Sequence, residues 1–341
     1  MSKNPLSGHA DPITGLDFGK SVEWKAQDNT CVFRYPMTPF LADYQQNLNT
    51  VLQAEVQIQQ TVRSHKISKD IEPIAGIKNI IAVASGKGGV GKSTTTIMLA
   101  HTLKQLGARV GILDADIYGP SIPTMLGVDQ QPESPDKKSF LPITANGIQA
   151  MSLGFLLDQK APAIWRGAMV TKALMQMLQD TRWDALDYLL IDLPPGTGDI
   201  QLTMIQKIPL TAAVIVTTPQ HISLIDAQKA LAMFKKVEIP VLGVIENMSS
   251  FVCENCGHES HIFGSGGGHS MAEEFAVELL GQLPLNIEIL QNMDTGNAQQ
   301  LWQADNPLNP IALKITLKMA QQLAQLPIAL KLGSSPLKLH L

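Results

Sequence analysis

A glycine-rich octapeptide constrains this chain more than any other feature of its sequence. It reads Gly86-Lys87-Gly88-Gly89-Val90-Gly91-Lys92-Ser93, which fits the phosphate-binding pattern G-x-x-x-x-G-K-[ST] and adds a lysine after the first glycine. An apolar run at residues 80–84 precedes it, and a segment of helical period at residues 94–106 follows it. A strand, a glycine turn and a helix N-terminus together make an anion nest, because backbone N–H groups and the helix dipole converge on phosphates. The sequence therefore predicts a nucleotide site rather than an ordinary glycine turn.

The same octapeptide assigns roles to its side chains. The backbone from Gly86 to Thr94 would wrap the phosphates of ATP, Lys92 would reach the β- and γ-phosphate oxygens, and the Ser93 hydroxyl would hold Mg²⁺.

Apolar runs alternate with helical segments over the rest of the chain. The runs lie at residues 80–84, 110–113, 188–193, 212–217 and 241–245, with a weaker one at 279–283, and an amphipathic closing helix is expected at 311–326. Continuous Val/Ile/Leu runs joined by helices are typical of a buried, mostly parallel sheet with helices on both faces. Ligands of such sheets bind at the carboxyl ends of the strands.

Residues 1–75 have a different pattern from the rest. Two short strand-like stretches precede a polar helical run at residues 41–62, and residues 66–76 have the composition of a linker. We therefore predict a small α+β N-terminal domain at 1–75 and an α/β nucleotide-binding domain at 76–341.

Polar residues follow three of the predicted strands. Asp114 and Asp116 follow the second run, and on a continuing strand they would share one side. We assign Asp114 to Mg²⁺ and Asp116 to the attacking water, although the spacing is equally compatible with the reverse. Asp192 ends the third strand as a further Mg²⁺ anchor, and the Pro-Pro-Gly-Thr-Gly after it suits a γ-phosphate sensor. Asn247, after the fifth strand, offers an amide that can face a purine edge.

Composition limits the cell compartment and the kinds of partner that we expect for this protein. The chain has 341 residues and a formal net charge of −4, so no global basic field favours nucleic acid. No apolar run approaches a membrane span, no secretory signal is visible, and residues 331–341 are broken by Gly and Pro. Its 3 cysteines do not make a disulfide framework. We expect a cytoplasmic protein with neither membrane nor nucleic-acid partners.

The pairing of Lys87 with Lys92 resembles the deviant phosphate loop of an ATPase class that includes MinD, ParA, the arsenite-pump ATPase and the nitrogenase iron protein. The resemblance implies that Lys87 acts across a homodimer interface on the partner's nucleotide. A second cation near the γ-phosphate neutralises charge that develops in the transition state, as an arginine finger does.

Cys253 and Cys256 form a C-x-x-C turn, which brings two thiolates to one point. Two soft ligands do not complete a tetrahedral metal site or a cluster. Either His258 and His261 complete a local zinc site, at unusually tight spacing, or two chains share one metal centre. A thioredoxin-like redox pair is less favoured, because the motif does not open a helix in a βαβ unit.

Over about residues 76–300 the sequence is closely similar to the Mrp/ApbC family of iron–sulfur cluster carrier ATPases. The resemblance rests on five motifs: residues 87–94, 114–121, 192–199, 247–249 with the C-x-x-C, and 262–264 with Gly266-Gly267-Gly268. It implies a P-loop NTPase that hydrolyses ATP slowly with Mg²⁺ and holds a bridging 4Fe–4S cluster on Cys253 and Cys256 of a homodimer. It would receive the cluster from an upstream assembly scaffold and pass it to apo-proteins.

This sequence departs from that family in two places. The family motif usually reads C-P-x-C, and Glu254 replaces the proline here. The N-terminal region weakly resembles a small domain that carries a cysteine shortly after a Thr-Pro pair. Phe40 and Leu41 follow Thr38-Pro39 here, so we expect no metal chemistry from it and expect Cys31 to be a core residue.

Two other functions fit parts of the pattern. A positioning ATPase of the MinD or ParA kind would share the loop, but that role would not explain the C-x-x-C. An ATP-dependent electron donor like the nitrogenase iron protein would share a bridging cluster, although its ligating cysteines lie far apart in sequence.

Overall fold

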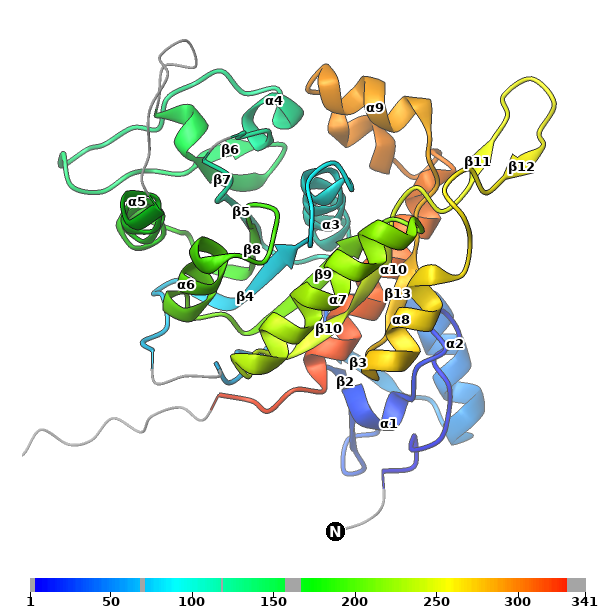
Figure 1. Ribbon diagram of the computed structural model, residues 1–341. Coiled ribbons are helices and arrows are strands. Elements are labelled where there is room, and N and C mark those ends of the chain that lie inside the picture. The colour runs from blue at the N-terminus through cyan, green and yellow to red at the C-terminus, as the bar shows by residue number, and fades with distance from the viewer. Residues whose placement is uncertain (1–3, 68–70, 118, 157–166, 330–341) are drawn as a thin grey trace, which may run out of the picture.

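The computed structural model describes residues 4–67, 71–117, 119–156 and 167–329. Its centre is an eight-stranded sheet in the order β13-β10-β9-β4-β8-β5-β7-β6 (Figure 1). All neighbours in this sheet are parallel except β6 and β7. The strands are β4 (Ile77–Ala84), β5 (Val110–Asp114), β6 (Ile143–Ala145), β7 (Ile148–Ser152), β8 (Leu186–Asp192), β9 (Ala212–Thr217), β10 (Val241–Glu246) and β13 (Leu279–Gln282).

The six apolar runs in the sequence all form strands of this sheet, which confirms the predicted α/β architecture. β5, β8 and β9 are buried along their whole length, as expected for strands covered on both faces. The sequence did not predict β6 and β7. They are short, and the Gln and Ala of β7 have weak strand propensity, so pairing with β5 decides their conformation.

Helices cover both faces of the sheet, and each face has its own hydrophobic cluster. On one face lie α3 (Lys92–Gln105) and α10 (Leu308–Ala324), with the shorter α4 (Ile122–Leu126) and α9 (Ile287–Asp294) at its edge. On the other lie α5 (Gly167–Asp180), α6 (Asp199–Lys207), α7 (His221–Lys236) and α8 (Gly267–Phe275). The predicted helices at 94–106 and 311–326 are confirmed as α3 and α10.

The N-terminal region forms a second, three-stranded sheet of β1 (Val22–Lys25), β2 (Thr30–Phe33) and β3 (Gln57–Gln60), with α1 (Phe18–Ser21) and α2 (Leu41–Leu52). The prediction of one helical run over 41–62 is wrong. The helix ends at Leu52, because Gln53 has a φ of 50° in the left-handed region. The polar strand β3 then pairs with β2, a tertiary contact that overrides its low strand propensity.

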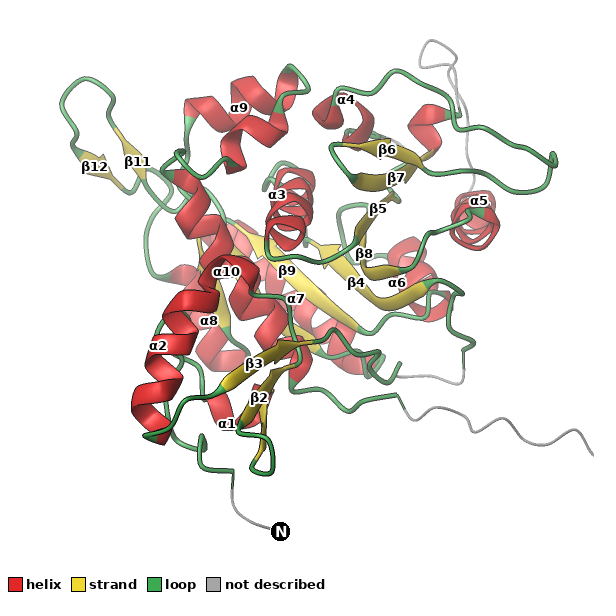
Figure 2. Cartoon of the chain, turned by 180° about the vertical axis from the view of Figure 1, so that it is seen from behind, coloured by secondary structure: helices red, strands yellow, loops and turns green. Residues whose placement is uncertain are grey.

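This N-terminal region packs directly against the nucleotide-binding domain. Residues of both regions belong to one continuous hydrophobic cluster, and Figure 2 shows the small sheet and α2 beside α10. A buried polar network crosses the contact: Gln321 of α10 donates to Asp11 Oδ2 at 3.3 Å and to Ser21 Oγ at 3.2 Å, and Tyr44 donates to Asp11 at 2.8 Å. Cys31 is fully buried in this cluster, where burial raises the pKa of its thiol to about 11. It is a core residue, as expected.

A separate hairpin leaves the sheet after β10. Its strands, β11 (Phe251–Val252) and β12 (Glu259–Ser260), have 2 residues each and stand out from the body of the protein (Figures 1 and 2). A bridge between Phe251 and Leu285 ties its base to the segment before α9. Among the helices formed by the described residues, none is long and apolar enough to cross a membrane.

Candidate nucleotide and cysteine sites

The phosphate-binding loop connects β4 to α3 at the carboxyl edge of the sheet. It surrounds a cavity of about 200 Å³. Most of the predicted nucleotide ligands line this cavity, which is formed by Ser85, Lys87, Gly88, Gly89, Gly91, Lys92, Ser93, Thr94, Asp116, Met125 and Pro195. Val90 instead points into the core, with 2% of its surface exposed. A Cβ at Gly86 would overlap the backbone of Asp226, so this glycine lets the loop lie directly against α7.

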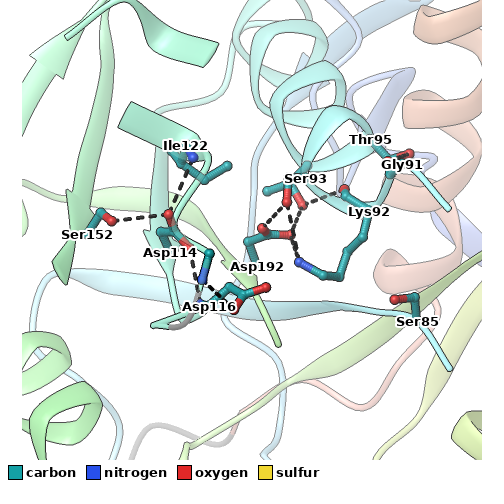
Figure 3. A network of polar contacts seen from close by, with 12 residues as sticks. Ser85, Gly91, Lys92, Ser93, Thr95, Asp114, Asp116, Ile122, Ser152 and Asp192 are labelled. Atoms are coloured by element: carbon teal, nitrogen blue, oxygen red, sulfur yellow. Dashed lines mark hydrogen bonds and ion pairs between the residues drawn. The ribbon is translucent and has the colours of Figure 1, made fainter. Parts of the chain in front are cut away.

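Lys92 and Ser93, which line this cavity, both contact the buried Asp192, as Figure 3 shows. Lys92 Nζ lies 2.8 Å from Asp192 Oδ1, and the Ser93 hydroxyl donates to Asp192 Oδ2 at 2.6 Å. Thr96, one turn into α3, donates to Asp192 Oδ1 at 2.8 Å. Asp192 is fully buried, so its charge depends on these partners.

The Ser93 and Asp192 oxygens fit the Mg²⁺ site that the sequence predicts. A hydroxyl and a carboxylate are hard oxygen ligands of the kind that Mg²⁺ takes beside nucleotide phosphates. Asp192 ends β8 next to the loop, and Lys92 lies close enough to exchange its carboxylate for a phosphate oxygen.

Asp114 and Asp116 do not share one side of a strand, so that expectation is wrong. β5 ends at Asp114, and the chain turns so that the Asp116 N–H donates back to Asp114 Oδ1 at 3.1 Å. Asp114 Oδ2 accepts from the Ile122 N–H at 3.3 Å and from the Ser152 hydroxyl at 3.1 Å (Figure 3). Burial, with a smaller contribution from Asp192, raises the pKa of the Asp114 carboxyl to about 8. Only Asp116 lines the cavity.

Both oxygens of Asp114 accept hydrogen bonds from the chain, as both oxygens of Asp192 do, and burial raises the pKa of the Asp114 carboxyl. A direct contact between Asp114 and Mg²⁺ stays a prediction. Asp114 lies opposite Asp192 in the β5–β8 register, a position from which its hydrogen bonds hold the neighbouring backbone of the site in place.

Lys87 reaches out of its own loop. Its ammonium group donates to Gln220 Oε1 at 3.4 Å, where Gln220 precedes the first turn of α7. The lysine is half-buried and lines the cavity. In this single chain it therefore rests on α7 at the rim of the site.

The Pro-Pro-Gly-Thr-Gly segment after β8 closes another side of the cavity. Pro195 lines it, and the Gly196 N–H donates to the Ser85 carbonyl at 3.0 Å. Gln201 of α6 holds the segment by donating to the Pro195 carbonyl at 2.7 Å. This segment is thus bonded to the residue that precedes the phosphate loop, and its response to a γ-phosphate stays a prediction.

Asn247 lies behind the phosphate loop. Its side-chain amide donates to the Val90 carbonyl at 3.0 Å, and 6% of the residue is exposed. One of its two amide hydrogens is thus engaged by the loop, and a contact to a purine stays a prediction.

Cys253 and Cys256 lie at the tip of the projecting hairpin. Cys256 is exposed and Cys253 is half-buried. The Gly257 N–H donates to the Cys253 carbonyl at 2.8 Å, which closes a tight turn between the two thiols. Backbone N–H groups of Cys256 and Asn255 lower the pKa of the Cys253 thiol, and the Cys256 thiol adds to this effect. A thiolate is the form that binds soft metals.

The histidines of the hairpin do not converge on these thiols. His261 Nδ1 donates to the Ser249 carbonyl at 2.8 Å, at the base of the hairpin, and His258 is exposed. Among the described residues, no three His, Cys, Asp or Glu side chains are grouped to hold a metal ion. This arrangement disfavours the local zinc alternative.

Several residues of the site were missed from the sequence. Thr96 and Ser152 bind the two buried aspartates, and Gln220 binds Lys87. Glu246 is buried beside Asn247 and accepts from the Gly268 N–H at 2.6 Å, at the start of α8. Only Thr96 carried a local signal, since it lies one helical turn from Lys92.

The sheet order, the strand–loop–helix geometry and the Lys92–Ser93–Asp192 cluster together define a P-loop NTPase of the MinD/ParA-like fold. The family described as ParA: NUBPL iron-transfer P-loop NTPase matches residues 76–323. The chain therefore belongs to this family.

Individual relatives agree with that membership. The chain is 54% identical over 251 residues to a protein of Haemophilus influenzae named iron-sulfur cluster carrier protein, covering 73% of this chain and 68% of the relative. A nucleotide-binding protein of Archaeoglobus fulgidus, solved in complex with ADP, has a TM-score of 0.59 and 39% identity and covers 66% of this chain and 89% of its own. The cell division ATPase MinD of Pyrococcus furiosus has a TM-score of 0.54 at 19% identity, over 71% of this chain and 98% of its own. The MinD likeness concerns the fold alone.

Proposed function

We propose that this protein is an ATP-hydrolysing carrier of iron–sulfur clusters that works as a homodimer in the cytoplasm. The observation that carries the proposal is the Cys253–Cys256 pair, with Cys256 exposed, presented at a hairpin tip by a P-loop NTPase of the iron-transfer family. Relatives named as cluster carriers support it. Its partners would be an upstream assembly scaffold and acceptor apo-proteins.

The cargo would be held between two copies of the chain. One hairpin supplies two thiolates, and a 4Fe–4S cluster is held by four. A two-fold axis through the hairpin tips would place Cys253 and Cys256 of both copies around one cluster. Because Cys256 is exposed, a cluster bound there is accessible to an acceptor protein.

ATP hydrolysis at the nucleotide site would drive cluster loading or transfer, and the residues that it needs already lie close together. Lys92 would move from Asp192 to the β- and γ-phosphates, and backbone N–H groups of residues 86–94 would cradle them. Ser93 and Asp192 would hold Mg²⁺, which neutralises phosphate charge when bound. Asp116, which faces the cavity, would position the attacking water.

Lys87 would act on the nucleotide of the partner subunit. In the single chain its ammonium group donates to Gln220 at 3.4 Å, at the rim of the cavity. Hydrolysis would then require the dimer, because the lysine that neutralises transition-state charge comes from the opposite subunit.

The proposal is tested by anaerobic reconstitution with iron and sulfide. We expect about four irons per dimer, with the visible absorption of thiolate-bound iron–sulfur, and loss of both in Cys253→Ala. The buried Cys31 offers a matched control, since Cys31→Ala removes a cysteine far from the hairpin and should leave iron binding intact.

Other results would contradict the carrier function. A colourless protein that holds zinc, or iron content that Cys253→Ala does not change, would leave a dimeric ATPase without a cluster cargo. ATP-dependent cosedimentation with liposomes or DNA would then favour a positioning ATPase. Electron transfer from a cluster that never leaves the protein would favour the electron-donor alternative.

A further inference from the structure

The contact between Asn247 and the phosphate loop joins the two sites of this protein. Asn247 Nδ2 donates to the Val90 carbonyl at 3.0 Å, and the Asn247 N–H donates to Thr217 at the end of β9 at 2.8 Å. A Cβ on Gly91 would overlap Asn247 Nδ2, so the loop packs directly onto this amide. Any shift of the loop on nucleotide binding acts on a buried contact with little free space around it.

The chain runs from Asn247 straight into the cysteine hairpin. Met248 has a φ of 57°, which is uncommon for a residue with a flexible side chain and indicates a tightly determined turn. Ser249 follows and is fixed by its N–H and hydroxyl, which donate to the Leu283 carbonyl at 2.9 and 3.1 Å. The Ser249 carbonyl accepts from His261 Nδ1 at 2.8 Å, and His261 lies just beyond β12.

This short segment therefore touches the nucleotide loop at one end and both legs of the hairpin at the other. β11 begins at Phe251, immediately after it, and its two strands have 2 residues each. A hairpin with so short a ladder has little stability of its own, so its base decides its orientation.

We propose that Asn247 is a positioning residue that couples nucleotide occupancy of the phosphate loop to the conformation of the Cys253–Cys256 hairpin. Nucleotide binding rearranges the Val90 carbonyl, Asn247 follows it, and the Met248 turn passes the change to Ser249 and the hairpin base. This deepens the proposed carrier function, because it makes ATP the ligand that regulates the cysteine site. It is distinct from a purine contact, which would alter only the affinity for nucleotide.

The experiment uses the full chain without cluster and the reactivity of its thiols. Iodoacetamide labelling of Cys253 and Cys256 is followed by mass spectrometry, with and without Mg–ADP or a slowly hydrolysed ATP analogue. We expect saturating nucleotide to change the labelling rate of the wild type by about fivefold, the lower end of typical coupling factors. In Asn247→Ala and in the isosteric Asn247→Asp, which cannot donate to Val90, the ratio should fall to about one.

Each variant is measured at nucleotide concentrations that saturate it, so a weaker affinity does not imitate lost coupling. Asn79→Ala is the matched control: Asn79 is also a buried asparagine whose amide donates to backbone carbonyls, but at the opposite end of β4. It should keep the wild-type ratio, and buried Cys31 reports any global loosening.

Three results would overturn the inference: a wild-type ratio of one, a wild-type ratio in both Asn247 variants, or an equal loss in Asn79→Ala. None of them depends on cluster binding. A failure to load iron would therefore reject the carrier function separately from the coupling.

Discussion

The phosphate loop lies at the carboxyl edge of the central sheet, packed against α7 and Asn247, whereas the cysteine hairpin projects from the body of the protein on two strands of 2 residues each. Around the loop, Asp192 is fully buried and receives three side-chain contacts from Lys92, Ser93 and Thr96. At the hairpin tip, Cys256 is exposed and Val252 is half exposed, at 50%.

The difference agrees with the ligands that we propose for the two sites. A triphosphate is stabilised by fixed dipoles and charges in a place from which water is largely excluded, and this requires a rigid frame. A cargo that enters and leaves intact needs accessible ligands and a segment of low local stability. In the proposed function this protein separates the two requirements, and residues 247–249 connect the two sites along the chain.

The largest expected effect is on the free energy of unfolding, and it differs between the phosphate loop and the cysteine hairpin. Lys92→Ala should abolish nucleotide binding and lower the free energy of unfolding by about 3 kcal/mol, because it leaves the buried Asp192 without its cation. Cys253→Ser should change the same quantity by less than about 0.5 kcal/mol, since it alters an exposed turn. Urea unfolding of both variants without nucleotide measures the contrast, and equal losses would show that the hairpin is as integral to the fold as the loop.

The second prediction concerns catalysis across the dimer. Lys87→Ala should lower the ATP hydrolysis rate by about a hundredfold or more while nucleotide affinity changes little, because the lysine serves the transition state. Asp116→Ala should be similarly slow.

Mixing the two inactive variants tests whether Lys87 acts in trans. Half of the dimers in an equal mixture are mixed, and each of these has one complete site, so about a quarter of the wild-type rate should return. A phosphate-release assay measures it. No recovery would place Lys87 in the site of its own subunit.

A third prediction concerns the pH dependence of the stability that one buried residue of the nucleotide-binding domain contributes. His101 on α3 is buried, and burial, with a smaller effect of Lys104, lowers its pKa to about 4. At His101 the unfolded state therefore binds more protons between about pH 4 and pH 6.5, so the stability that this residue contributes falls as the pH drops through this range, whereas the raised pKa of Asp114 acts in the opposite direction. The His101 contribution should cost about 1–2 kcal/mol between pH 7 and pH 5.

His101→Gln should remove this contribution, so the stability of the variant between pH 7 and pH 5 should change by that amount relative to the wild type, and His258→Gln, at an exposed hairpin position, should keep the wild-type dependence. Thermal unfolding at both pH values gives the comparison. A flattened profile in the His258 variant would mean that the hairpin contributes to global stability.

The smallest expected effect lies in the hairpin turn. Glu254 is the first residue inside the turn that the 2.8 Å hydrogen bond from the Gly257 N–H to the Cys253 carbonyl closes. A proline ring is compatible with this position, as it is with the first position of a helix. Glu254→Pro should stiffen the turn and slow cluster loss to a chelator by no more than about threefold. Glu254→Ala separates the ring from the lost charge, and an equal effect in both variants would assign the change to charge.

The sequence was most informative where function depends on neighbouring residues. The phosphate loop, Asp192 and the C-x-x-C were all visible, because a glycine turn, a strand end and a thiolate pair are local patterns. The apolar runs located six of the eight central strands, since buried parallel strands have continuous hydrophobic composition. Polar β3 and short β7 were missed because their partners, not their residues, make them strands.

The same limit applies within the site. Spacing alone placed Asp114 and Asp116 together, but β5 ends at Asp114 and sends the two carboxylates into different surroundings. Nor could spacing show that Lys87 rests on Gln220, more than a hundred residues away, or that Asn247 supports Val90. These contacts depend on which strands lie side by side.

By itself, then, the sequence determined the class of chemistry: a phosphate loop with two lysines, a strand that ends in a carboxylate and a pair of thiols, each specified by local backbone geometry and residue type. The tertiary structure decided which carboxylate is buried, how the N-terminal region packs on α10, and that the two sites share one connecting segment. Long-range packing sets these features, because burial and desolvation act only after distant segments have been brought together.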